Sequence, residues 1–300
     1  MFERRDHLDA LAIGLLLLLC FLWGFAQITI KLAATGISPL MQAGIRSVIA
    51  VLCLTAWMFF RRIPAFKKDN TLVPGIGAGL LFALEFGLIY WGLEYTSASR
   101  AVIFIYTSPF VVALGVHLLV PKERLGRLQL LGMLLAFCGV IVTFAEGITV
   151  LGGRAWMGDL LCFVGAIFWG ATTVLIRVTK LVAIEPSRTL FYQLLVSALL
   201  LPIFSVLLGE SGVTSLTPVV LACLAFQGVI VAFASYLTWF WLIAHYPANR
   251  LATYTFLTPL FGVLCGVVFL SEPFTRGVLL GLALVMSGIY MVNLKTAKAE

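Results

Sequence analysis

Residues 23–31 read WGFAQITIK, and residues 169–177 read WGATTVLIR. Each stretch begins with Trp-Gly and ends, after an uncharged run, on a basic residue eight positions beyond the tryptophan. The similarity continues along the chain, because at an offset of 150 residues Pro109 aligns with Pro259. The sequence therefore repeats itself once, and this repeat restricts the folds that the chain can adopt.

Composition places both copies of the repeat in a membrane. Of the 300 residues, 62% are hydrophobic and 11% are charged, whereas a soluble domain has about 25% charged residues. Uncharged runs of 17 to 21 residues recur at 10–30, 101–121, 128–145, 160–176, 189–209, 251–271 and 277–294. A helix of roughly 20 apolar residues crosses the hydrocarbon core. With a longer run at 211–249 and segments near 40–60 and 74–94 that are each interrupted by one charge, the chain is predicted to form ten transmembrane helices.

The number of spans in each copy predicts how the copies are related. Residues 1–150 form the first unit and residues 151–300 the second, with the similarity confined to about 9–146 and 156–294. Each unit holds five spans, and because five is odd, the second unit must cross the membrane in the opposite sense. Inverted repeats of this kind are common in secondary transporters that work by alternating access, although channels and some membrane enzymes are also duplicated.

The positive charges follow the predicted topology. With ten spans and the N-terminus inside, fifteen Lys and Arg residues fall on the inner face and four on the outer face, namely Lys31, Arg100, Arg154 and Arg276. This positive-inside bias predicts that both termini are cytoplasmic, and it accounts for the net charge of +7 without a nucleic-acid partner. The first run is longer than the core of a signal peptide, so we expect it to remain as the first span.

Polar residues form a stripe along the first span and another along the sixth. The stripes comprise Trp23, Gln27 and Lys31 in the first span and Trp169, Thr173 and Arg177 in the sixth. Positions four residues apart share one face of a helix, and a polar face within a membrane usually meets a protein interior or a wet cavity. We interpret the first two residues of each stripe as lining a cavity, with helix packing as the alternative. The basic residues that end the stripes are interpreted as snorkelling to the interface.

Two prolines interrupt the fourth and ninth spans near their midpoints. Pro109 and Pro259 each remove one backbone hydrogen bond, and the freed carbonyl group needs a partner inside the protein. The matched kinks are interpreted as hinges or as one wall of a binding site, with static packing kinks as the alternative. Tyr106 and Tyr254 lie near these kinks, and Tyr236 lies at mid-depth in the eighth span, so all three are cavity candidates. An aromatic cavity suits amphipathic organic solutes better than bare ions.

Two charges lie within spans, Glu85 near the centre of the third and Arg46 in the second. Their depths differ by about 5 Å on the helical rise, so a structural ion pair is one interpretation. In a second interpretation, Glu85 is a protonatable group that couples export to protons, and in a third it binds a cationic part of the substrate. For Arg46, snorkelling to the outer surface is a further alternative.

The sequence contains no pattern typical of a metal site, a cofactor site or an enzyme centre. The six cysteines all fall within spans and lack metal-ligand spacing, and the three histidines are scattered. No paired acids and no nucleophile–base spacing occur in the spans or in their short loops. We therefore expect a protein that holds no metal or cofactor and is not an enzyme.

These features resemble the EamA-type members of the drug/metabolite transporter superfamily over nearly the whole chain. Residues 23–31 are similar to the family's first helix, and SPLMQAGIRSVIAVL at 38–52 resembles its second. Residues 93–142 and 244–291 resemble the helix 3–5 and helix 8–10 blocks, which share a mid-helix Pro, a Glu after the next loop and a Gly pair beyond it. The positions that match the family pattern are Trp23, Arg46, Pro109, Glu123, Pro259 and Glu272.

The resemblance implies a ten-helix bundle of two inverted five-helix halves around a cavity lined by helices 1, 3, 4, 6, 8 and 9. It also implies a secondary carrier, and it suggests a structural or gating role for Glu123 and Glu272, whereas no family pattern places an acid at Glu85. We predict an exporter of small organic metabolites, amino acids including aromatic ones, across the bacterial inner membrane. The alternatives are multidrug efflux and, in another class, a channel-like pore. The expected partners are the small-molecule substrate, the lipid bilayer and, for a coupled cycle, protons.

Overall fold

The computed structural model describes residues 8–119, 126–146, 149, 153–246, 251, 254–255 and 257–293. Within these residues the chain is helical, with no β-strand beyond a single bridge between Ile37 and Val213. The helices of the first half are α1 (Ala10–Ala33), α2 (Pro39–Phe60), α3 (Leu72–Tyr95), α4 (Ala98–Ile105), α5 (Ser108–Leu119) and α6 (Arg127–Glu146). Those of the second half are α7 (Ala155–Val178), η2 (Lys180–Ala183), α8 (Pro186–Leu207), α9 (Pro218–Ala225), η3 (Phe226–Ser235), α10 (Tyr236–His245), α12 (Leu257–Leu270) and α13 (Arg276–Asn293).

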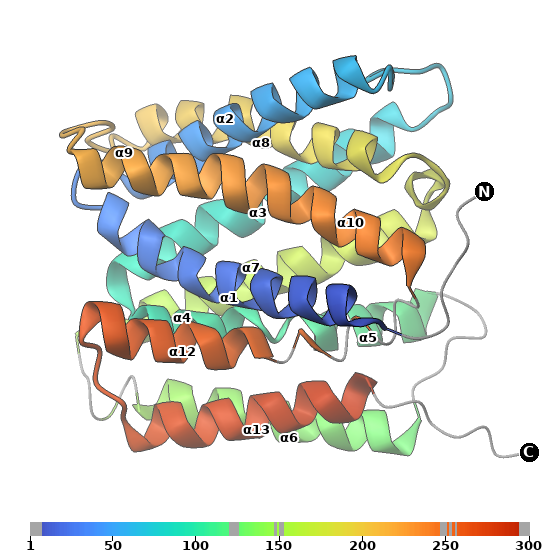
Figure 1. Cartoon of the computed structure of the whole chain (residues 1–300). Helices are drawn as coiled ribbons and strands as arrows, with labels where there is room; N and C mark the ends of the chain where they lie inside the picture. The colour runs from blue at the N-terminus through green and yellow to red at the C-terminus, as the bar shows by residue number, and fades with distance from the viewer. Residues whose placement is uncertain are drawn as a thin grey trace, which may run out of the picture.

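The helices account for the expected spans. Eight segments are long and apolar enough to cross a membrane, and two shorter apolar helices, α12 and α13, follow them. Two of the eight are composite: Ala98–Leu119 contains α4 and α5, and Pro218–Leu242 runs from α9 through η3 into α10. This set is consistent with the ten predicted spans. In Figure 1, α1 begins and α13 ends at the same end of the bundle, as an even number of crossings requires.

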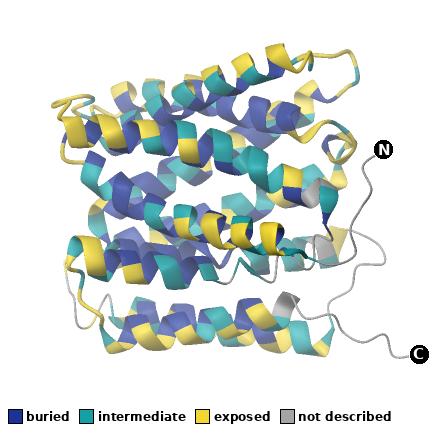
Figure 2. Cartoon of the chain, in the orientation of Figure 1, coloured by how far each residue is buried: buried dark blue, intermediate teal, exposed yellow. Residues whose placement is uncertain are grey.

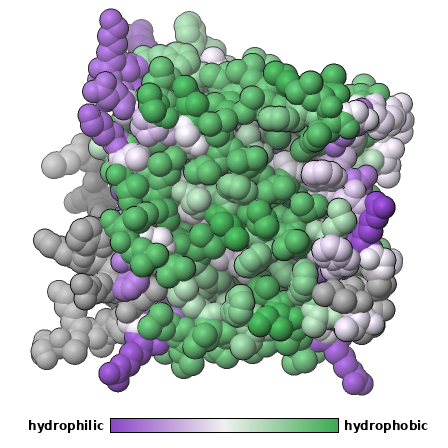
Figure 3. Space-filling model, turned by 180° about the vertical axis from the view of Figure 1, so that it is seen from behind, coloured by the Kyte–Doolittle hydropathy of each residue, from purple (hydrophilic) through white to green (hydrophobic). Residues whose placement is uncertain are grey.

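The distribution of side chains shows that the bundle is built to sit in lipid. Large apolar side chains such as Leu52, Phe59 and Val268 are exposed, whereas Arg100 and Asp159 are buried. Exposed residues follow the outward faces of the helices in Figure 2, and in Figure 3 an apolar surface separates hydrophilic groups near the two ends. Hydrocarbon accepts apolar side chains and offers no hydrogen bonds, so polar groups turn inward. The chain is therefore a multi-pass membrane protein.

Helices of the two halves interlock. α6 lies along α13, α3 along α7, α2 along α8 and α1 along α12, and each pair takes one helix from each half. When each span is replaced by its counterpart in the other half, one helix contact becomes another observed contact. The packing of α1 on α12 corresponds to that of α7 on α5, and the packing of α3 on α8 corresponds to that of η3 on α2. The two halves therefore bury one shared interior.

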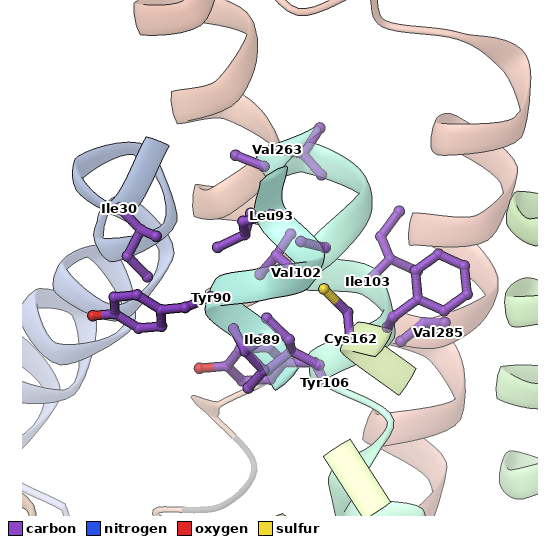
Figure 4. Packing of buried hydrophobic residues seen from close by; sticks show 14 of the residues in the cluster. Ile30, Ile89, Tyr90, Leu93, Val102, Ile103, Tyr106, Cys162, Val263 and Val285 are labelled. Carbon is purple, nitrogen blue, oxygen red and sulfur yellow. The ribbon is translucent and has the colours of Figure 1, made fainter. Parts of the chain in front are cut away.

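The short helix α4 lies at the centre of this interior. Every residue from Ala98 to Ile105 is buried, so α4 is covered on all sides. Figure 4 shows Val102 and Ile103 of α4 surrounded by side chains from both halves. The labelled neighbours come from α1, α3, α7, α12 and α13 and include Ile30, Leu93, Cys162, Val263 and Val285.

The two prolines begin new helices where continuous, kinked spans were expected. The fourth span breaks after Ile105, and α5 restarts at Ser108 with Pro109 as its second residue. Pro259 is likewise the third residue of α12. The first four N–H groups of a helix have no intrahelical acceptor, so a proline in the first turn costs no hydrogen bond. The fourth span is thus discontinuous at mid-depth, next to Tyr106, and in the ninth span Pro259 lies in the first turn of α12.

Glycines bring α3 and α7 into close contact. A Cβ added at Gly158 would lie 2.6 Å from the Gly92 carbonyl oxygen and 2.7 Å from the Thr96 nitrogen. Both neighbours are backbone atoms, which cannot yield without moving α3. Only glycine at position 158 therefore allows the two helices to approach this closely.

We expect Gly158→Ala to destabilise the protein by about 1–3 kcal/mol, the usual cost of overpacking a tight contact. The matched control is Gly14→Ala in α1, because a Cβ at Gly14 meets no atom within 4 Å. Thermal unfolding of the two variants in the same detergent makes the comparison. Equal midpoints would show that α3 and α7 do not need this close approach.

Candidate functional site

Five buried polar residues from the two halves meet in the interior. We call them the central polar cluster: Gln42 and Arg46 of α2, Glu85 and Tyr90 of α3, and Gln227 of η3, each at most 2% exposed. The Gln227 side-chain oxygen accepts hydrogen bonds from the Tyr90 hydroxyl at 2.9 Å and from Gln42 Nε2 at 3.2 Å. Polar residues at this depth are costly in a membrane protein and usually mark a functional site.

A π-helical segment supplies one side of this cluster. η3 extends the α9 helix with wider turns, and its buried residues Gln227, Val231 and Ser235 recur every four positions. Gln227, in the first turn of this segment, meets the cluster, and Ser235 at its end accepts a hydrogen bond from Trp23 of α1. π-Helical insertions are frequent at functional sites. No feature of the uncharged run 211–249 predicted this segment.

The guanidinium of Arg46 is held by an aromatic ring. Its Cζ lies 3.8 Å from the centroid of the Phe86 ring and 5.9 Å from that of Tyr90. Such cation–π contacts stabilise a buried cation in a fixed orientation. Arg46 is only 2% exposed, so it does not snorkel to the surface.

Glu85 lies in the same cluster as Arg46 without pairing to it. Glu85 directly precedes Phe86, the ring on which the Arg46 guanidinium stacks. No ion pair joins the two among the described residues, however, and Glu85 Oε2 is buried without a hydrogen-bond partner. The expected ion pair is thus not formed in this structure, and both charges retain unused hydrogen-bonding capacity.

The first stripe reaches the eighth span. The Trp23 indole nitrogen donates to Ser235 Oγ at 2.9 Å, and its ring lies 5.6 Å from Trp239 and 6.5 Å from Tyr236 between centroids. Tyr254 joins this side through its carbonyl oxygen, which accepts a hydrogen bond from the Cys20 thiol at 3.4 Å. Trp23 therefore links α1 to the end of the π-helical segment and to α10, both in the eighth span.

The second stripe is placed differently. The Trp169 ring meets Tyr106 edge-on, with centroids 5.6 Å apart. Thr173 lies apart from these residues, because it is exposed and its hydroxyl donates to the Trp169 carbonyl oxygen. Gln27 of the first stripe is buried, and its side-chain oxygen has no hydrogen-bond partner. The two stripes thus contribute unequally to the interior.

Of the two basic residues that end the stripes, both expected to snorkel to the interface, Lys31 is placed differently. Lys31 Nζ donates to the carbonyl oxygens of Leu93 at 3.1 Å and Thr96 at 2.6 Å, where α3 ends. A cation in this position satisfies carbonyl groups left free at a helix C-terminus. Lys31 therefore caps a helix and does not snorkel, whereas Arg177 is exposed.

A buried ion network that the sequence did not reveal closes one end of the bundle. Arg100, which the charge count had placed on the outer surface, is 2% exposed. Its Nε donates to Asp159 Oδ1 at 3.2 Å, its Nη2 donates to Asp159 Oδ2 and to the Thr143 carbonyl oxygen, and its Nη1 donates to Glu146 at 3.2 Å. We call these four residues the Arg100 network. It joins α4, α6 and α7 at the end opposite the start of α1.

Carboxylates from loops and helix ends cap helices of the other half. Glu272 accepts hydrogen bonds from the Ala98 and Ser99 amides at 2.7 and 2.8 Å, at the start of α4. Glu146 likewise accepts from the Gly277 amide at 2.9 Å, at the start of α13. Negative groups stabilise helix N-termini. Glu272 thus has a structural role as a helix cap. Its repeat partner Glu123 lies outside the described residues.

Asp69, in the loop before α3, forms an ion pair with Arg188 of α8 at 2.7 Å. The hydrogen bond from Arg188 lowers the pKa of Asp69 well below its usual value. A carboxyl group with a depressed folded-state pKa adds stability that is present above the unfolded pKa of about 3.9 and is lost only as the pH falls through the depressed value. The pair therefore persists at physiological pH.

Comparison with known proteins supports a single family. Residues 10–145 and 156–294 match the model of the EamA-like transporter family. A probable amino-acid metabolite efflux pump of Escherichia coli (strain K12) is 26% identical over 294 residues, which cover 92% of this chain and 93% of that protein. The uncharacterized transporter YvbV of Bacillus subtilis is 29% identical over 283 residues, with coverage of 94% and 91%. A solved crystal structure shares the fold, with a TM-score of 0.67 at 19% identity and coverage of 93% and 95%.

We expect Asp159→Asn to lower the stability of the protein by about 3–5 kcal/mol, because it leaves the buried Arg100 charge without its main partner. The control is Asp69→Asn, whose side chain is 25% exposed and faces a solvated loop, so its loss should be much smaller. Thermal unfolding in detergent compares the two. Similar shifts for both variants would contradict a dominant role for the Arg100 network.

Proposed function

This chain belongs to the EamA-like transporter family, and from that premise we propose that it is a secondary carrier that exports amino acids, aromatic ones included, by alternating access. The membrane would be the bacterial inner membrane, since a relative in Escherichia coli is named an inner membrane transporter. The name of another relative, a probable amino-acid metabolite efflux pump, supports the class of substrate.

The observation that carries the proposal is the double match to one family model, together with the five spans that we predict in each matched half. An odd number of spans per half inverts the second half relative to the first. The exchange of contacts between α1·α12 and α5·α7 agrees with a two-fold axis in the membrane plane. Such pseudo-symmetry allows two equivalent packings, one open to each side.

The arrangement of polar and aromatic groups supports a central substrate site. Trp23 and Tyr236 meet on one side, and Tyr106 and Trp169 meet on the other. Each pair joins one residue from each half. Tyr106 lies at the break of the fourth span, and Tyr236 directly follows the π-helical segment. Aromatic faces with a few polar groups suit organic solutes that carry an apolar part.

The Arg100 network supports a gate at one end. It ties α4 and α6 of the first half to α7 of the second with buried hydrogen bonds. In an alternating-access cycle these bonds would break when this end opens, which is the behaviour expected of a gate.

Flux measurements in proteoliposomes test the proposal. We expect saturable uptake of at least one aromatic amino acid, stimulated by unlabelled amino acid on the other side, because trans-stimulation requires a carrier cycle. Trp23→Ala should lower this flux by about tenfold, equivalent to about 1.4 kcal/mol of lost interaction. Trp156→Ala, on the exposed side of α7, is the matched control and should transport like the wild type.

Other outcomes of the same assay point to the alternatives. Flux that neither saturates nor shows trans-stimulation would indicate a channel-like pore. Folded protein that carries toxic organic cations and no amino acid would indicate multidrug efflux. Repeating the assay with and without a pH gradient distinguishes proton-coupled export from facilitated diffusion.

A further inference from the structure

Arg46 differs from the other buried arginines in what its guanidinium binds. Arg100 forms an ion pair with Asp159 and Arg188 forms one with Asp69, so each of these cations has a carboxylate partner. In the part of the chain that the structure describes, Arg46 has no carboxylate partner, and its Nε and Nη2 are buried without a hydrogen-bond partner. An unpaired buried charge is strongly destabilising unless another group completes its bonds.

The two free nitrogens of Arg46 form one edge of the guanidinium. Nε and Nη2 point their N–H groups in parallel, which matches the two oxygens of a carboxylate. The same protein shows this fit at Arg100, whose Nε and Nη2 bind the two oxygens of Asp159. Phe86 covers the face of Arg46 and leaves this edge unused.

A carboxyl group lies nearby. Glu85 directly precedes Phe86, the ring on which the Arg46 guanidinium stacks, and Glu85 Oε2 is also buried without a hydrogen-bond partner. Tyr236 lies beside Trp23, and it packs against the same hydrophobic cluster as Phe86. An unpaired guanidinium edge and an unpaired carboxyl oxygen thus lie on the side of the cluster that leads to an aromatic pair.

We propose that Arg46 and Glu85 recognise the two charges of a zwitterionic α-amino acid. The free edge of Arg46 binds the carboxylate, Glu85 accepts a hydrogen bond from the ammonium group, and the substrate's side chain lies toward Trp23 and Tyr236. This assignment rests on the proposed function and makes it specific, because it requires both charges on the solute.

Competition in wild-type proteoliposomes tests the assignment directly. L-Phenylalanine counterflow, or that of whichever aromatic amino acid is carried best, is challenged with two analogues. Phenylalaninamide lacks the carboxylate, and 3-phenylpropionate lacks the ammonium group. We expect each analogue to compete at least about tenfold more weakly than the parent, since each leaves one buried charge unpaired.

Variants assign each charge to its residue. In Arg46→Gln, the preference for the amino acid over its amide should fall toward unity, while the preference over 3-phenylpropionate is kept. In Glu85→Gln, the preference over 3-phenylpropionate should fall toward unity, while the preference over the amide is kept. Arg188→Gln removes a buried arginine outside the cluster and should keep both preferences. Preferences are ratios, so they do not depend on how much of each variant folds.

Two results would overturn the assignment. If the wild type carries an aromatic amino acid but both analogues compete as well as the parent, Arg46 and Glu85 do not recognise these charges and the proposed function still stands. Unchanged ratios in both variants would lead to the same conclusion. If folded wild-type protein carries no amino acid, the assignment and the proposed function fail together.

Discussion

Hydrocarbon provides no hydrogen bonds, so every polar group inside this bundle depends on a partner from the protein or from a bound solute. Most of the described structure follows from that constraint. Lys31 binds free carbonyl oxygens where α3 ends, Glu272 caps α4, and Arg100 is enclosed by oxygen acceptors. The fourth span, which breaks at mid-depth, places its irregular backbone at Tyr106 and Thr107 inside the protein, where both residues are buried.

The central polar cluster satisfies this constraint only in part. The Gln227 side-chain oxygen accepts hydrogen bonds from Gln42 and Tyr90, but Arg46 and Glu85 keep unused donors and acceptors at almost no exposure, as does one side-chain atom of each amide. Arg100 provides a comparison within the same molecule, because it is also an arginine buried in the bundle. One arginine fastens helices together, and the other is held by Phe86 with its carboxylate-binding edge free. The first suits a gate and the second suits a binding site.

Much of the fold was predictable because the signals are local. Length and apolarity of each run gave the helices, and the aligned Trp-Gly and Pro positions gave the duplication. The site was less predictable. Trp23 was recognised by its spacing with Gln27, and its contact with Tyr236 required the fold. Asp159 and Gln227 were missed, since a single acid or amide in an apolar run resembles many others until its partners are known.

The sequence by itself determined the lipid environment and the family, because these depend on composition and on residues close in the chain. Only the tertiary structure decided which charges meet. It paired Arg100 with Asp159, 59 residues away, and left Arg46 without a carboxylate although Glu85 lies in the same cluster. It also turned the kinks expected at Pro109 and Pro259 into helix starts. Pairing depends on helix rotation and crossing, which are set by contacts such as that of Gly92 with Gly158 between distant segments.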